Sequence, residues 1–77
     1  MNYSDVLKIT RRHSYDGHIV YEIIIERTFE DGTHRIEYSE NKPGKERWEA
    51  LKRFEELKKE NPSATVITDI ERRPWER

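Results

Sequence analysis

Apolar and polar residues alternate most regularly between positions 19 and 29 of the chain. Every second side chain there is apolar or aromatic, with one arginine as the exception. Because successive side chains of a strand point to opposite sides, this period of two predicts a strand from Ile19 to Phe29 with one face in a core. That face would carry Ile19, Tyr21, Ile23, Ile25 and Phe29.

Shorter alternating runs predict three further strands, over Val6 to Ser14, Thr33 to Ser39 and Ala64 to Ile70. Between the last two lies a stretch, Glu46 to Glu60, whose apolar residues recur at helical spacing. Glutamates lie early in it and lysines late, as the helix dipole favours. The apolar stripe of this predicted helix is Ala50, Leu51, Phe54 and Leu57.

These elements predict one α+β domain of order β-β-β-α-β, spanning residues 1–77 with residues 71–77 as a loosely attached tail. An antiparallel three-stranded meander and a fourth strand form one sheet, and the helix packs on one sheet face. The fourth strand is expected to run parallel to the first or to the third strand, and we favour the sheet order 4-1-2-3, which protects the short first strand in the middle. The expected core is Leu7, Ile9, Tyr21, Ile23, Ile25, Ile36, Tyr38, Leu51, Phe54, Leu57, Val66 and Ile70.

The dipeptide Asp31-Gly32 predicts the turn of the second hairpin. A two-residue loop pairs Glu30 with Thr33 and sorts apolar from polar side chains on the two faces. The resulting pairs on the apolar face are Phe29 with His34, Arg27 with Ile36, and Ile25 with Tyr38, while Glu26 faces Glu37 on the other.

The dipeptide Asp16-Gly17 predicts the first hairpin, and here a two-residue loop would turn lysine and arginine into the core. A three-residue loop is therefore expected, and two such loops stay open. One is Asp16-Gly17-His18, which sets Lys8 against Glu26 and Arg12 against Glu22. The other is Tyr15-Asp16-Gly17, which puts glycine where a left-handed residue is wanted.

The composition narrows the classes of function. The chain is 32% hydrophobic and 40% charged, but its 15 basic and 16 acidic residues nearly cancel to a net charge of −1. That balance disfavours nucleic-acid and membrane-surface binding, which need a basic excess. The absence of cysteine excludes disulfides and thiol chemistry, and no signal peptide is visible, so a cytoplasmic location is expected.

No group of residues suggests catalysis, a metal site or a cofactor, so we expect a protein that is not an enzyme and binds no small molecule. His13 and His34 are expected on the core face but two strands apart, and His18 lies in a loop. The serines lie at strand and turn boundaries, where this residue is common. The three glycines lie in turns, so there is no glycine-rich phosphate loop.

The helix and closing strand, from Glu46 to Pro62 followed by Ala64-Thr-Val-Ile, resemble those of small uncharacterised phage and bacterial β-β-β-α-β domains. The resemblance implies a fold and an accessory role, and it carries over no catalytic residue. A designed protein without a biological function is an alternative, since such sequences also have clean turns and helix ends.

Several apolar residues are not needed for the expected core, and tryptophan is enriched at binding hot spots. They predict a protein-interaction module that binds a host protein, for example as a phage-encoded inhibitor, or forms a homodimer. The candidate protein-binding residues are Val6, Val20, Ile24, Trp48 and Trp75. The alternative is a nucleic-acid-binding accessory protein that uses Arg11, Arg12, Arg72 and Arg73.

Overall fold

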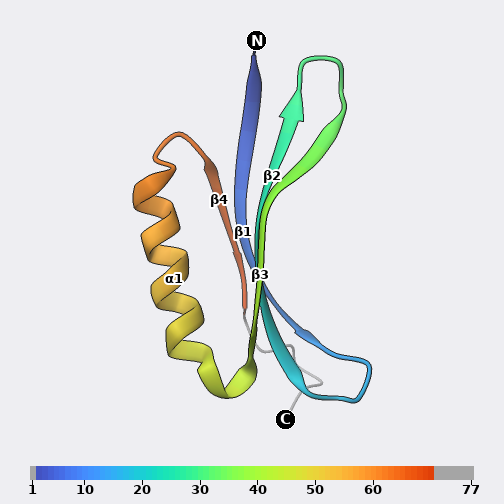
Figure 1. Cartoon of the computed structure of the whole chain (residues 1–77), viewed down its shortest axis with the longest axis vertical. Coiled ribbons are helices and arrows are strands. Elements are labelled where there is room, and N and C mark those ends of the chain that lie inside the picture. Colours follow the sequence, from blue (N-terminus) through green and yellow to red (C-terminus); the bar gives the residue numbers. More distant parts are fainter. Residues whose placement is uncertain (1, 71–77) are drawn as a thin grey trace.

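The structure is a computed structural model of the chain and describes residues 2–70. Its elements follow the order β-β-β-α-β (Figure 1). A 3-10 turn, Gly44–Glu46, leads into the helix. The strands and the helix are β1 Tyr3–His13, β2 Ile19–Phe29, β3 His34–Pro43, α1 Arg47–Glu60 and β4 Thr65–Asp69.

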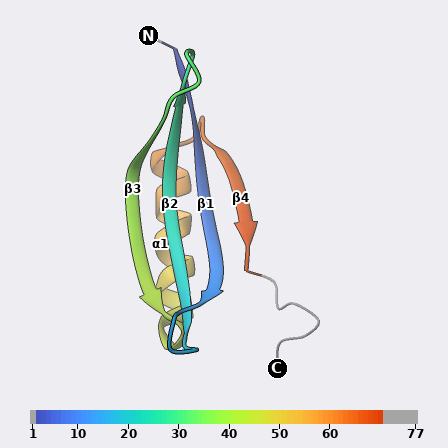
Figure 2. The ribbon, with the colours of Figure 1, turned by 90° about the vertical axis from the view of Figure 1, so that its right-hand side faces the viewer.

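The four strands form one sheet in the order β3-β2-β1-β4. β1, β2 and β3 are an antiparallel meander, and β4 runs parallel to β1. α1 lies on one face of the sheet, behind the strands in Figure 2. The α+β class, the order of elements and the predicted sheet order are therefore confirmed.

The core lies between α1 and the two central strands. Most of the expected core residues are buried or partly buried there, and Ala50 joins them from the helix. Two expectations are wrong, because Ile36 is 50% exposed and Val66, on the outer strand β4, is 41% exposed. The buried side chains are Leu7, Ile9, Tyr21, Ile23, Ile25, Ala50, Phe54 and Leu57.

The first hairpin uses the loop Tyr15-Asp16-Gly17. The Ser14 amide donates to the His18 carbonyl over 2.7 Å, and Gly17 has a φ of 87°. A side chain at that φ is strained, which explains the glycine. This loop sets Lys8 opposite Ile24 and Arg12 opposite Val20.

The second hairpin has the same kind of loop, Glu30-Asp31-Gly32, so the predicted two-residue loop is wrong. The Phe29 amide donates to the Thr33 carbonyl over 2.9 Å, and Gly32 has a φ of 88°. The longer loop shifts the predicted pairing by one residue near the turn. The observed pairs there are Thr28 with His34, Arg27 with Arg35, and Glu26 with Ile36.

A β-bulge restores the predicted pairing further along β3. The register changes between Ile25 and Glu26, so that Ile25 lies opposite Tyr38 as expected and Glu37 is the extra residue. Ile36 therefore shares the face of Glu26, away from α1, which is why its side chain is half exposed. For the same reason His34 lies on that face, where its ring nitrogen is 3.0 Å from the Thr28 hydroxyl.

Two arginines of α1 hold tyrosines of the sheet. Arg47 donates to the Tyr21 hydroxyl over 2.7 Å, and Arg53 donates to the Tyr38 hydroxyl over 3.2 Å. Tyr38 itself donates to Glu40, and burial together with this bond raises the pKa of the Tyr38 hydroxyl. These contacts supplement the small apolar core at its margins.

The corrected position of Ile36 can be tested by truncation. We expect Ile23→Ala to lower the free energy of unfolding by about 2–5 kcal/mol, because Ile23 is fully buried. Ile36→Ala should lower it by less than about 1 kcal/mol. Urea unfolding measures both, and Ile23→Val against Ile36→Val gives the same comparison if the alanine variant of Ile23 does not fold. Equal losses at the two positions would restore Ile36 to the core.

Candidate functional site

The sheet face opposite α1, called the open face below, is covered by no element of residues 2–70 (Figure 2). The pairing of the strands fixes which side chains it carries. The expected residues Val6, Val20 and Ile24 lie on it and are partly exposed. Sequence reasoning missed two further apolar members, Ile36 and Ile67, which are 50% and 42% exposed.

Apolar and charged residues alternate at the centre of the open face. Val6 of β1 lies opposite Glu26 of β2, and Lys8 of β1 lies opposite Ile24 of β2. Val6 and Ile24 thus occupy one diagonal of a four-residue square, and Lys8 and Glu26 occupy the other. We call these four residues the central square.

The two charges of the central square differ from the other charges of the sheet. Among residues 2–70, Lys8 and Glu26 take part in no ion pair or hydrogen bond of their side chains. Arg12 and Glu22, further along the same face, approach each other to 3.6 Å. The central square therefore presents one cation and one anion to solvent, both without a partner in the described part of the chain.

The tryptophan candidates do not join this surface. Trp48 is 77% exposed, but it belongs to α1 and so lies on the other side of the sheet from the open face. Trp75 falls outside the described residues. A single flat partner could not contact Trp48 and the central square together.

The arginines of the nucleic-acid alternative are divided in the same way. Arg11 and Arg12 are consecutive residues of β1 and point to opposite faces of the sheet. Arg12 faces the carboxylate of Glu22. Arg72 and Arg73 fall outside the described residues, so no basic surface is assembled from Arg11 and Arg12 alone.

Charged and aromatic residues pair at the end of the sheet that α1 does not reach. Arg27 donates to both carboxylate oxygens of Asp5, over 2.9 and 3.1 Å, and its guanidinium lies 3.7 Å from the centre of the Tyr3 ring. The hydrogen bonds from Arg27 lower the pKa of the Asp5 carboxyl. Sequence reasoning missed this pair, although the register of the first hairpin places the two residues opposite each other.

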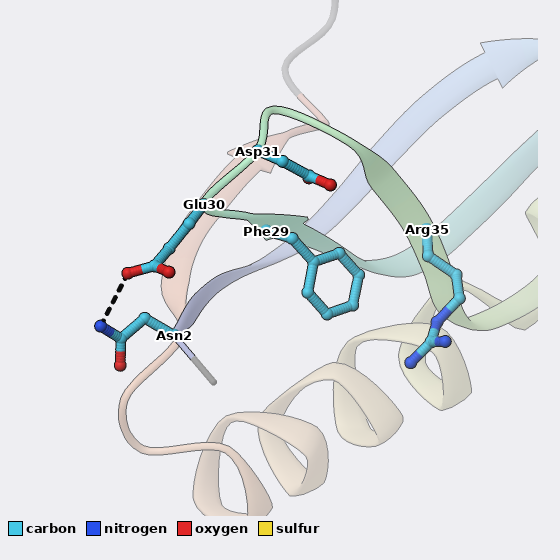
Figure 3. Close-up of a pocket in the computed structure, with 5 residues that line it drawn as sticks. All are labelled: Asn2, Phe29, Glu30, Asp31 and Arg35. Carbon is cyan, nitrogen blue, oxygen red and sulfur yellow. Dashed lines mark hydrogen bonds between the residues drawn. The ribbon is translucent and has the colours of Figure 1, made fainter.

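A shallow pocket of about 590 Å³ lies beside the second hairpin (Figure 3). Its polar groups already have neighbours within the chain: Asn2 donates to Glu30 over 2.8 Å, and Asp31 accepts from the Thr33 amide and hydroxyl. The Arg35 guanidinium lies 5.3 Å from the Phe29 ring and forms an ion pair with Glu37. These contacts stabilise the hairpin and leave no polar group aimed at a ligand.

The first turn brings together a serine, an aspartate and a histidine, but not in a catalytic order. The Ser14 hydroxyl donates to Asp16, and the His18 ring nitrogen lies 2.8 Å from the other oxygen of Asp16. A serine nucleophile needs a base that accepts its proton, usually histidine, whereas here the aspartate separates the two. The group therefore fixes the turn.

Other kinds of site are not found in the described part of the chain. Residues 2–70 contain no group of histidine and carboxylate side chains that could hold a metal ion. No helix in this range is long and apolar enough to cross a membrane. The open face is accordingly the strongest candidate for a functional surface.

The charge of Asp16 provides a test of the first turn. Hydrogen bonds from Ser14 and His18 lower the pKa of its carboxyl from the usual 3.8 to about 2. Because the folded value is the lower one, the stabilisation is complete above pH 3.8 and is lost as the pH falls through about 2. An NMR titration should show this midpoint, and Ser14→Ala should raise it without changing that of Asp31. A midpoint near 3.8 in the wild-type chain would contradict the turn geometry.

Comparison with known proteins adds no relative: no family model matches the chain, and no match was found among curated proteins or solved structures.

Proposed function

We propose that this chain is a protein-interaction module without enzymatic activity, and that it binds its partner through the open face. The observation that carries the proposal is the difference between the two sides of the sheet. One side buries most of its apolar residues under α1, with Val66 of the outer strand 41% exposed. The other leaves five apolar side chains partly exposed, namely Val6, Val20, Ile24, Ile36 and Ile67.

The position of Ile36 supports this proposal beyond simple strand propensity. β-branched residues favour strands on either face, so Val20 and Ile24 alone would be weak evidence. Ile36 reaches the open face because of the longer turn, and the bulge at Glu37 then returns Tyr38 to the core. The irregularity thus enlarges the open face while it preserves the core, and bulges are common where a strand serves a site.

The distribution of ion pairs supports it as well. Asp5, Arg27 and Arg35 have partners within the chain. Lys8 and Glu26, at the centre of the open face, have none among residues 2–70. Binding surfaces combine apolar contacts with charges that meet complementary charges on a partner. We place this binding in the cytoplasm, with a second copy of the chain or a host protein as the two partner classes.

Site-specific photo-crosslinking in cells tests the proposal. A benzophenone amino acid in place of Ile24 should capture a protein, because Ile24 lies at the centre of the open face and the partner would cover that position. The same amino acid in place of Lys52, an exposed position of α1, is the matched control and should capture little. A third variant at Trp48 shows whether the helix side forms a separate contact. Equal, weak capture at Ile24 and Lys52 would rule out the open face as a binding surface.

A further inference from the structure

The central square has a symmetry that specifies its partner. Its apolar diagonal, Val6 to Ile24, crosses its charged diagonal, Lys8 to Glu26, at the middle of the two central strands. When two copies of such a face meet about a two-fold axis in the plane between them, each residue lands on its mirror position across that axis. If the axis runs along the apolar diagonal, Lys8 of each copy lies over Glu26 of the other.

We propose that the chain forms a two-fold symmetric homodimer through the open face, with two reciprocal Lys8–Glu26 ion pairs around a Val6 and Ile24 contact. This inference rests on the proposed function and names its partner as a second copy of the chain. In this arrangement Val6 meets Val6 and Ile24 meets Ile24. The two charges that lack a partner within residues 2–70 obtain one each, which is the charge complementarity of a specific interface.

The other simple two-fold arrangements are unfavourable. An axis along the charged diagonal brings Lys8 onto Lys8 and Glu26 onto Glu26, which repel each other. An axis along the strands sets Lys8 against Ile24, and an axis across them sets Lys8 against Val6. Both bury a charge against an apolar side chain without a counter-charge, which is costly.

The chosen axis also predicts how the two sheets cross. Strands about 4.8 Å apart, with same-face residues about 6.8 Å apart along each strand, place the apolar diagonal about 35° from the strand direction. The strands of the two copies then cross at about 70°, near the orthogonal class of sheet packing. Two faces about 14 Å wide that cross at this angle overlap over roughly 200 Å², which is below the size of stable specific interfaces, so a weak dimer that dissociates on dilution is expected.

Sedimentation equilibrium of the full chain, from micromolar to millimolar concentration, tests the dimer. The wild-type chain should change from monomer to dimer within this range. Lys8→Glu and Glu26→Lys should each weaken dimerisation by about tenfold or more, because each variant creates two repulsive contacts. Lys58→Glu makes the same charge change as Lys8→Glu, but on α1, and should leave the dimer unchanged.

Mixing the two single variants is the decisive measurement. A Lys8→Glu chain and a Glu26→Lys chain place opposite charges at both reciprocal contacts, so together they should form a heterodimer with about the wild-type affinity. Circular dichroism checks that each variant is folded. A wild-type chain that stays monomeric to millimolar concentration would overturn the proposal, and so would a mixture that associates no better than the single variants.

The failures of the two proposals can be distinguished. Crosslinking of Ile24 to a different protein, together with a monomeric wild-type chain, would reject the homodimer and keep the interaction module. Crosslinking of Ile24 to a second copy of the chain would support both. No crosslink at Ile24 and no dimer would reject both.

Discussion

The contact between α1 and the two central strands is the constraint on which the rest of the structure depends. Leu7, Ile9 and Ile23 are fully buried beneath Phe54 and Leu57, and each such side chain contributes about 1.5–3 kcal/mol when it leaves water. A helix of 14 residues is about 21 Å long, whereas a strand of 11 residues extends about 37 Å. α1 therefore covers little more than half the length of the central strands.

The part of the sheet that extends beyond the helix must be stabilised in another way (Figure 1). On the same face, where the helix no longer provides an apolar cover, the central strands carry Asp5 and Arg27 instead of isoleucine and leucine. Their paired hydrogen bonds and the neighbouring Tyr3 ring satisfy the charges without a core. The change from apolar to polar side chains along this face thus marks where the helix ends.

The fold could be predicted because the period of two in β2 and the helical stripe of α1 are strong local patterns. The register of the second hairpin could not be predicted, because the dipeptide Asp-Gly favours two-residue loops. Asp31-Gly32 instead belongs to a three-residue loop. Both loops place Gly17 or Gly32 as the third residue, with φ near 88°, and use Asp16 or Asp31 to bind the amide two residues on. The three-residue loop that ends in glycine, one of the two options for the first hairpin, is therefore the loop of the second hairpin as well.

The candidate surface could be predicted only where the alternation of side chains along a single strand decides which face each residue is on. Val6, Val20 and Ile24 follow from alternation along two strands, whereas Ile36 lies on the open face because the second turn is one residue longer than predicted. Ile67 reaches the surface through the register of β4 on β1, which is a long-range contact. Residue preferences describe neighbours along the chain, and these positions are set by neighbours across the sheet.

The same limit explains why the central square became visible only in three dimensions. Lys8 lies on β1 and Glu26 on β2, so their relative position depends on the register between the two strands. The other loop considered for the first hairpin, Asp16-Gly17-His18, would have placed them directly opposite each other as an internal ion pair. The observed register moves them onto a diagonal and gives each an apolar residue as its direct neighbour. An internal pair would stabilise one chain, whereas a diagonal of separated charges can be matched by a second, rotated copy. A purely apolar face would associate in many orientations, and two fixed charges of opposite sign restrict it to the few in which they meet.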